Sequence, residues 1–458
     1  MASPRHLNTL RGSSWRSLSQ TRSAPLPHAE GKASRHRIPS ARLTGSQTSK
    51  TVCGLPRPLL AARSGRSTTT NNPQRLKHTQ SPRLYTTTTT KPTPQRRLPA
   101  SYYRGGTSRA PILHLSSLPP SPTLWAPLFH TILGSPDPFG RQLNGLGGGI
   151  SSLSKLCLVG PATRMGADVD FTFVQMGIRD GVLDYRGSCG NMTAGVAAFA
   201  VDEGLVALPQ GQEGEEGGEV VVRIHNTNTG KLIEATVPVI GGEAAAMGDF
   251  AISGVPGTGA CIKLAFLDPA GSVTGTLLPT GRAVDVFEGV EVTCIDASNP
   301  CVFIAAESLG VEGTISPAEM RAHPDLLERL KAIRCQAAVK MGMCETVEGT
   351  PAGVPKISLV SPPAEEGVDI IVRAVSTGDP HGAVPISVGV SVAAAAGVEG
   401  SVVARVMRER KAGEGGEGVV VAHPSGRMVV DARFDGGRLE RAVVFRTARR
   451  IMSGWVYV

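Results

Sequence analysis

The sequence of 458 residues lacks several patterns that would place it in a familiar class of protein. It has no run of about 18 or more strongly apolar residues, so no membrane-spanning helix is predicted. Its eight cysteines form no C-x-x-C pair and its ten histidines are dispersed, so no metal site is indicated. No hydrophobic signal peptide precedes the cysteines, and we expect reduced thiols in an intracellular compartment.

Acidic residues are nearly missing from residues 1–100, which carry 18 Lys and Arg against one acid, Glu30. The remainder carries 29 basic and 37 acidic residues, so the net charge of +9 comes from the N-terminal arm. A nucleic-acid partner would need a basic face on a folded domain and is therefore not predicted. Residues 1–97, rich in Ser, Thr, Pro and Arg, are predicted to be disordered. This bias is typical of a mitochondrial transit peptide and a matrix enzyme; a plain disordered tail on a cytoplasmic protein is the alternative.

From Leu98 onward, short β-branched segments alternate with Gly-rich turns. Strands are predicted over residues 156–162, 220–227, 233–240, 289–297, 301–306, 368–375, 401–407, 419–423 and 441–452. Helices are predicted over 190–204, over 317–343 after a capping box of Ser316 and Glu319, and over 382–398. Because regular βαβ alternation is missing, the pattern favours a strand-rich α+β fold. The first and last helices are small and apolar throughout, so we expect two similar halves, each with a central buried helix, and helix starts that face each other.

Cys189 stands at the start of the predicted helix 190–204, in the segment RGSCGNMTAG. The first turn of a helix has unpaired backbone N–H groups and partial positive charge, which favour the thiolate form of a cysteine placed there. Gly190 allows close approach to the backbone, and the same N–H groups suit a carboxylate. Cys189 is therefore a candidate acid–base group or nucleophile, with a buried structural cysteine as the alternative.

Lys155 ends the segment GGGISSLSK just before a predicted strand. The segment is not a phosphate-binding P-loop, because no Gly precedes the lysine and Leu156 stands where Ser or Thr is required. A desolvated lysine near other cations has a lowered pKa and can act as a general base. An ordinary surface lysine is the alternative.

Two further segments could hold an anion. In YYRGGTSR, Arg104 offers a guanidinium beside the hydroxyls of Thr107 and Ser108 and exposed backbone N–H groups, although a simple turn explains the segment equally well. In GDPH, His381 precedes the third predicted helix and is either a helix-start residue or a substrate contact.

Several long motifs occur in one order along the chain. They are LPASYYRGGTSR, SPDPFGRQLNGLGGGISSLSK, ADVDFTFVQMGI, GSCGNMTAGVAAFAVDEGLV, TLLPTGRAVD, DASNPCVFI and TARRIMSGWVYV. From about Leu98 to Val458 the chain resembles the 2-methylaconitate cis-trans isomerase family, whose relatives include 3-methylitaconate isomerase and 4-oxalomesaconate tautomerase. The resemblance implies a diaminopimelate-epimerase-like fold, with a first half over 98–285 and a second half over 286–458.

The resemblance also implies an activity without a metal or organic cofactor. Such enzymes shift or isomerise a double bond by removing an allylic proton beside carboxylates of a small unsaturated di- or tricarboxylate. On that pattern Lys155 removes the proton, and Cys189 is the second acid–base group or positions the substrate. The substrate-binding set predicted with them is Arg104, Gly106, Thr107, Ser108, Ser151, Ser152, Gly190, Asn191, Asn299, Ser376 and His381. No membrane partner is expected, and a homodimer is left open.

The chain departs from the family pattern in ways that bear on the substrate. Asn144 stands where an acidic residue is frequent, Arg109 replaces a lysine, and Gly149 and Ile150 replace Ala-Thr. A second active-site cysteine, as in the epimerases of this fold, has no counterpart in STGDPHGAV; Cys301 is the one candidate and is expected to sit to one side. This argues against an amino-acid racemase or epimerase. A catalytically silent small-acid-binding protein is the other alternative, and the retention of both Lys155 and Cys189 argues against it.

Overall fold

The computed structural model describes residues 94–208, 217–407 and 418–458. Contacts divide the chain into two units, Met1–Thr88 and Thr89–Val458, and all described residues lie in the second. The predicted transit peptide falls outside the described residues except for its last four, so a mitochondrial address stays a prediction. Within the described ranges, no helix has both the length and the apolar character needed to cross a membrane.

Among the described residues, the strands of the second unit form one hydrogen-bonded sheet of 19 strands. Those before residue 270 are β1 (Arg97–Gly105), β2 (Ser108–His114), β3 (Lys155–Pro161), β4 (Val169–Met176), β5 (Leu183–Asp184), β6 (Gly218–Asn226), β7 (Lys231–Ile240), β8 (Glu243–Ala244) and β9 (Ile262–Leu267). Those after it are β10 (Asp285–Phe287), β11 (Val290–Ala297), β12 (Asn299–Ala305), β13 (Lys356–Ser361), β14 (Ile370–Ser376), β15 (Asp379–Pro380), β16 (Val419–His423), β17 (Gly426–Asp435), β18 (Arg438–Arg446) and β19 (Ala448–Tyr457).

The same pairing scheme occurs twice in this sheet. In the first half β2 pairs parallel with β3, β3 antiparallel with β4, and β4 parallel with β6. In the second half β12, β13, β14 and β16 repeat these three steps. Antiparallel pairing of β9 with β18 joins the two halves. The mixed sheet in two similar halves confirms the predicted α+β fold.

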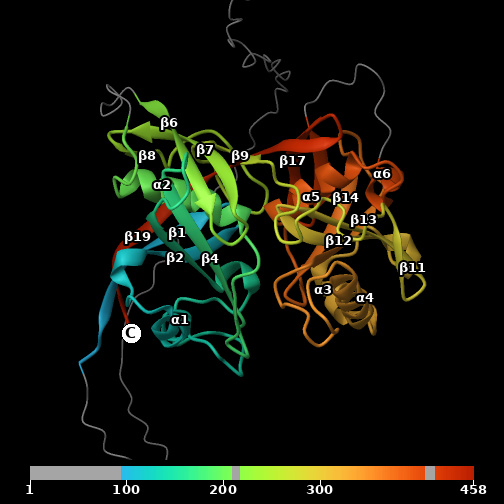
Figure 1. The fold of residues 1–458 in the computed structure, drawn as a ribbon, viewed down its shortest axis with the longest axis horizontal. Coiled ribbons are helices and arrows are strands. Elements are labelled where there is room, and N and C mark those ends of the chain that lie inside the picture. Colours follow the sequence, from blue (N-terminus) through green and yellow to red (C-terminus); the bar gives the residue numbers. More distant parts are fainter. Residues whose placement is uncertain (1–93, 209–216, 408–417) are drawn as a thin grey trace, which may run out of the picture. The chain divides into compact units, whose positions relative to one another are not determined.

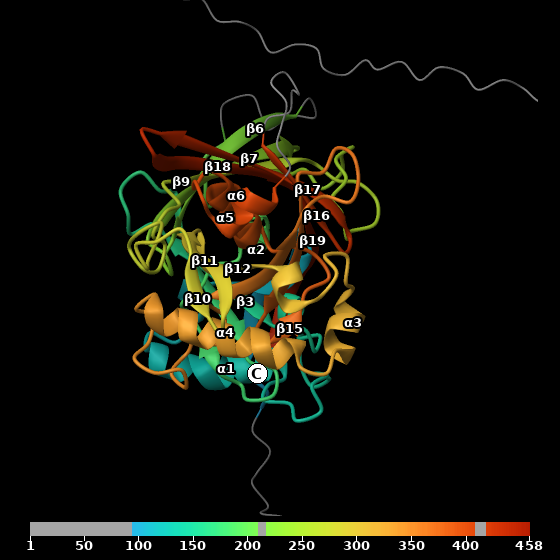
Figure 2. The same cartoon turned by 90° about the vertical axis from the view of Figure 1, so that its right-hand side faces the viewer.

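Each half surrounds one buried helix. The helices are α1 (Trp125–Leu133), α2 (Gly190–Asp202), α3 (Pro317–Ala322), α4 (Leu326–Lys340), α5 (Ile386–Ala396) and α6 (Val402–Val406). Figure 1 shows α2 among the strands of the first half and α5 among those of the second, and in Figure 2 the strands β11, β12, β16, β17 and β18 surround α5 and α6. Both central helices carry small apolar residues on every side, so each is buried all round and both belong to one hydrophobic core.

Two helices outside this core cover the sheet elsewhere. Side chains of α4, among them Leu330 and Ile333, pack on β11, β12 and β13 in a second cluster. Side chains of α1, among them Phe129 and Leu133, pack on β2, β3 and β4 in a third cluster. These two clusters lie against equivalent strands of the two halves, which extends the internal similarity beyond the central helices.

Three details differ from the predicted elements. Residues 401–407, predicted as a strand, form α6, because the Ser401 hydroxyl accepts from the N–H of Ala404 and caps a helical turn. The predicted helix 317–343 is two helices, α3 and α4, since Pro324 interrupts it while the Ser316–Glu319 capping box forms as predicted. The predicted strand 441–452 covers β18 and β19, which separate at Thr447.

The last strand of the chain returns to the first half. β19 pairs antiparallel with β1 along its whole length, from Arg97 opposite Tyr457 to Gly105 opposite Ala448. Figure 1 shows β19, in red, beside β1. A cut at residue 285 would therefore leave the first half without an edge strand, and the boundary between the halves stays a prediction.

Candidate active site

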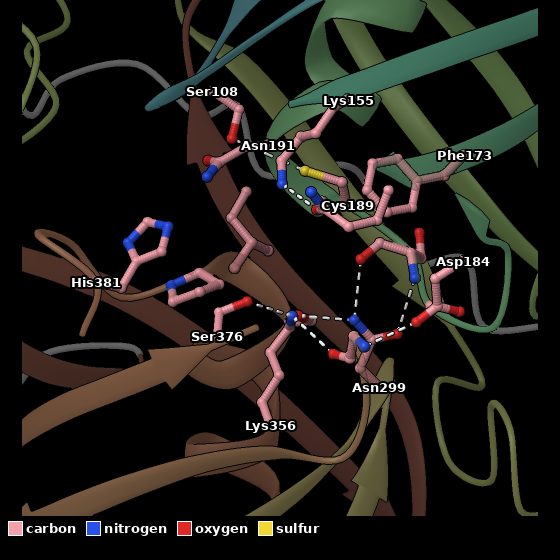
Figure 3. A pocket seen from close by; sticks show the side chains of 18 residues that line it. Ser108, Lys155, Phe173, Asp184, Cys189, Asn191, Asn299, Lys356, Ser376 and His381 are labelled. Carbon is pink, nitrogen blue, oxygen red and sulfur yellow. Dashed lines mark hydrogen bonds between the residues drawn. The ribbon is translucent and has the colours of Figure 1, made fainter. Parts of the chain in front are cut away.

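One pocket is lined by the starts of both central helices and by strand ends of both halves. Its lining residues are Ser108, Lys155, Phe173, Gln175, Asp184, Gly187, Ser188, Cys189, Gly190, Asn191, Asn299, Gly353, Lys356, Ser376, His381, Pro385, Ile386 and Ser387. Figure 3 shows Lys155 and Cys189 reaching into it from one side and Lys356 with Ser376 from the other. The pocket thus brings together residues separated by more than 200 positions in the chain.

The two helix starts face each other, as predicted. A Cβ atom on Gly190 would lie 2.7 Å from Cγ2 of Ile386, so the first residue of α2 must be a glycine for α5 to begin opposite it. The positive ends of both helix dipoles therefore point into the pocket, which favours a bound anion.

Lys155 is the first residue of β3 and is 7% exposed. Its Nζ donates to the Ser151 carbonyl and to Gln175 Oε1, each at 2.6 Å, and lies 5.5 Å from the centre of the Phe173 ring. Burial lowers the pKa of Lys155 to about 8; the thiol of Cys189 opposes the shift and the charge of Lys356 adds to it. A lysine in this state can hold or release a proton near neutral pH, which is what a general base requires.

Lys356 is a second lysine of the pocket, and the sequence analysis missed it. It is the first residue of β13, which occupies in the second half the place of β3 in the first. Its Nζ donates to Ser376 Oγ at 3.1 Å and to the Gly353 carbonyl at 3.3 Å, and burial lowers its pKa. A signal was available, because KLCLV at 155–159 and KISLV at 356–360 share lysine, aliphatic, small, leucine and valine in order.

Cys189 occupies the position immediately before α2, in extended conformation. Its thiol lies 3.9 Å from the Ser108 hydroxyl, to which it donates a weak hydrogen bond. The corresponding position before α5 is Pro385, which has no acid–base group. Cys301 is fully buried in β12 with a pKa raised by burial to about 12, and it does not line the pocket. Cys189 is therefore the one thiol among the described residues that line the pocket, and Pro385 stands where a second cysteine would face it.

Asn299 uses its side chain within the protein. Its Oδ1 accepts from the Ser188 N–H at 3.0 Å, while its Nδ2 donates to the Ser188 carbonyl at 2.9 Å and to Ser387 Oγ at 3.1 Å. Because Ser188 precedes Cys189 and Ser387 lies in the first turn of α5, Asn299 holds the two helix starts together. Its side chain has little capacity left for the substrate contact that the sequence analysis expected.

Asp184 is the one acidic side chain among the described lining residues. Its carboxylate accepts from the backbone N–H of Gly353 at 2.7 Å and of Arg186 at 2.9 Å. Gly353 in turn accepts from Lys356, so Asp184 of the first half supports the lysine of the second. Asp184 is not among the residues predicted from the sequence, and no motif marks its position.

Four more predicted residues line the pocket: Ser108, Asn191, Ser376 and His381. The Nδ1 atom of His381 accepts from the N–H of Ala383 at 3.2 Å, which leaves Nε2 as the protonated nitrogen. Burial, together with Lys155 and Lys356, lowers the pKa of His381 to about 4, so the ring is neutral at physiological pH and acts as a hydrogen-bond donor there.

The remaining predicted residues are not among those that line the pocket. Arg104 Nη1 donates to the carbonyl and hydroxyl of Thr447 at 2.8 and 2.9 Å, so the guanidinium ties the end of β1 to the residue that links β18 and β19. Gly106, at φ +51°, leaves room for the Asn191 side chain, whose Nδ2 donates to Thr107 Oγ1 at 3.0 Å. Ser151 supports Lys155 through its carbonyl, and Ser152 is buried without lining the pocket. These residues shape the site but do not reach into its cavity.

The sequence was compared with models of known protein families. The family model described as PrpF protein matches residues 95–458. The chain belongs to the PrpF family. It is 38% identical to 3-methylitaconate isomerase of Eubacterium barkeri (80% of this chain, 98% of the relative) and 36% identical to 4-oxalomesaconate tautomerase of Pseudomonas putida (80% and 97%).

Two further matches agree. The chain is 35% identical to 2-methyl-aconitate isomerase of Cupriavidus necator, over 80% of this chain and 98% of that one. A crystal structure of methylitaconate-delta-isomerase matches with a TM-score of 0.64 and 37% identity, over 80% of this chain and 96% of that chain. This PrpF protein is therefore an isomerase by family, with an α+β fold in two similar halves.

Proposed function

We propose that this PrpF protein moves an allylic proton in a small unsaturated di- or tricarboxylate, shifting the double bond or changing its geometry. The observation that carries the proposal is the pair of lysines, buried Lys155 and partly buried Lys356, which enter one pocket from equivalent strand starts beside Cys189. Lys356 as a cation on one side and the two helix N-termini suit a substrate with at least two carboxylates, while Lys155, whose pKa burial lowers to about 8, is placed to act as the base.

The electrostatics of the pocket support an anionic ligand. Two helix N-termini point into the cavity, and fixed N–H groups stabilise a developing enolate without reorganising. The one carboxylate among the described lining residues, Asp184, accepts from Gly353 and Arg186, and its charge favours the charged form of Lys356. The hydroxyl of Ser376 and the Nε2 of neutral His381 add donors on the side of Lys356.

In the proposed reaction, Nζ of neutral Lys155 takes the proton from the allylic carbon. The electron pair of the broken C–H bond delocalises into a dienolate that includes the adjacent carboxylate. A proton then returns to a different carbon, or to the same carbon after rotation, and the net composition of the substrate is unchanged. Cys189 either delivers that proton or positions the substrate, and Lys356 holds a carboxylate.

The relatives narrow the class of substrate. Methylitaconate, 2-methylaconitate and oxalomesaconate each place a carbon–carbon double bond next to carboxylates, and the matched relatives carry these names. We propose an acid of this class, with 2-methylaconitate as the reference member.

Hydrogen exchange in D2O tests the proposal directly. The full-length protein is mixed separately with 2-methylaconitate, methylitaconate, 4-oxalomesaconate and trans-aconitate, and deuterium incorporation is followed by proton NMR. We expect deuterium at an allylic carbon of one acid with the wild type and with the surface control Lys331→Ala. Loss of exchange is expected only in Lys155→Ala. Folded protein that exchanges none of these acids would contradict the proposed substrate class, and unchanged exchange in Lys155→Ala would contradict the assigned base.

A further inference from the structure

A second cavity of about 350 Å³ opens where two neighbouring strands separate. β17 and β18 are hydrogen-bonded from Asp435 opposite Arg438 as far as Val430 opposite Val444. Beyond that point Val429 pairs with β16, while Phe445 pairs with β9. The cavity lies in this gap, and residues 250–253 and the segment that precedes α5 complete its wall. Its volume is in the range of small-molecule sites.

Arg446 lies in the wall of this cavity and is 8% exposed. Its Nε donates to Asn191 Oδ1 at 3.3 Å, its Nη1 to the Phe445 carbonyl at 2.7 Å, and its Nη2 makes only a weak contact of 3.9 Å with the sulfur of Met428. No carboxylate of the described residues forms an ion pair with it, and burial lowers its pKa to about 10. A guanidinium has five N–H donors, so this buried cation retains donors for an anion.

No acidic side chain in the rest of the described wall offsets the charge of Arg446. No acidic residue is among the described lining residues, which include Thr107 and Ser253. Arg427, also in the wall, is already paired with Glu365 outside it at 3.0 Å. His423 is buried with a pKa lowered to about 4, so it contributes a neutral ring. Arg446 is therefore the cation that lacks a counter-ion.

The remaining wall is apolar, and in this respect the cavity differs from the active-site pocket. Phe250 and Phe445 contact each other with ring centres 6.3 Å apart, and Ile252, Val384, Met428 and Val429 add aliphatic surface. The active-site pocket, in contrast, holds two lysines and is lined mostly by polar groups. A ligand for the second cavity needs one anionic group and an apolar body.

We propose that this cavity binds a small monocarboxylate with an apolar or aromatic body, its carboxylate on Arg446 and its body between Phe250, Phe445 and Val429. The two pockets share no lining residue, so the site is distinct from the one that binds the isomerase substrate. Asn191 lies between them: it lines the active site and accepts from Arg446. The proposal does not depend on the identity of the isomerase substrate.

Benzoate is the probe, and benzamide is its neutral control. The full-length protein is titrated with each by calorimetry in the presence of saturating tricarballylate, a saturated tricarboxylate that occupies the active site. We expect one benzoate per chain and an affinity for benzamide at least about tenfold weaker, since the amide lacks the charge that Arg446 binds.

The matched variants Val429→Glu and Val429→Gln test the place of binding without touching the buried arginine. Val429 is 44% exposed, so both variants are expected to fold. The new carboxylate should weaken benzoate binding at least about tenfold relative to the isosteric amide, because like charges repel at the mouth. Equal affinities in the two variants, displacement of benzoate by tricarballylate, or inorganic phosphate binding as tightly as benzoate would each overturn the proposal.

Discussion

The two halves of the molecule share one arrangement of strands and lysines but differ in the side chains around each lysine. In each half a lysine begins the strand that pairs parallel to its predecessor, and its Nζ donates to a carbonyl just upstream and to a side chain of the next strand. Gln175 accepts from Lys155 and Ser376 from Lys356, and the two acceptors hold equivalent positions in β4 and β14. The scaffold of the site is therefore nearly symmetric.

The chemistry of the site is not symmetric. Cys189 precedes α2, whereas Pro385 precedes α5. Lys155 faces the apolar ring of Phe173, but Lys356 has the carboxylate of Asp184 as a neighbour that favours its charged form. This difference supports the proposal that one half carries the proton transfer and the other holds the substrate, and three experiments can break or sharpen that division.

The largest effect is expected from removing the lysines one at a time. Lys155→Ala should lower kcat by about 10²–10⁴-fold, the usual contribution of a general base, with a small change in KM. Lys356→Ala should raise KM and lower kcat less, because it removes a charge that binds the ground state and the transition state alike. Steady-state kinetics of both variants measure the split.

Lys331→Ala, on the exposed face of α4, is the control and should leave both constants unchanged. If Lys356→Ala lowered kcat as much as Lys155→Ala while KM stayed constant, the two halves would share the proton transfer and the division would fail.

The dependence of kcat/KM on pH should reflect the ionisation of both Lys155 and Lys356. Lys155 must be neutral to accept a proton, so kcat/KM should rise about tenfold per pH unit below its pKa of about 8 and level off above it. Lys356 must be charged to hold a carboxylate, and because burial lowers its pKa, activity should fall again at higher pH.

Rates measured from pH 6 to 10 test this profile, with Lys356→Arg as the matched variant. Arginine stays charged throughout this range, so the alkaline fall should disappear in the variant while the acidic limb remains. An acidic limb that vanished in Lys356→Arg would assign the base to the second half instead.

The smallest effect is expected at Asn299, whose side chain joins the starts of α2 and α5. Asn299→Ala leaves the backbone of Ser188 and the hydroxyl of Ser387 without their partner, so we expect a loss of about 1–3 kcal/mol in unfolding free energy. Activity should fall as well, because the start of α2 is no longer held against α5. Denaturant unfolding and kinetics measure the two effects.

Ser391→Ala is the control in the same core, since its hydroxyl bonds to backbone carbonyls within the second half alone. It should lower stability with little change in kinetics. If Asn299→Ala lost stability but kept full activity, the contact would be structural only.

Local sequence determined much of the fold. The uniformly small, apolar stretches at α2 and α5 have no polar face to expose, so burial of both helices followed from composition. Cys189 at the start of α2 and the capping box at Ser316 likewise followed from short-range patterns. Residues 401–407 show the limit, because their β-branched run favours a strand while a serine cap and packing beside α5 make it a helix.

Other features were decided by tertiary structure alone. Lys155 and Lys356 lie 201 positions apart in the sequence, and only the repeated sheet pairing brings them into one cavity that lowers both pKa values. The segment around Arg104 has the composition of an anion site. In the folded protein, however, β19 pairs with β1, and the Arg104 guanidinium donates to the Thr447 carbonyl just before β19. Sequence thus specified which groups can do acid–base chemistry, whereas burial and long-range pairing, which no local pattern encodes, decided which of them meet.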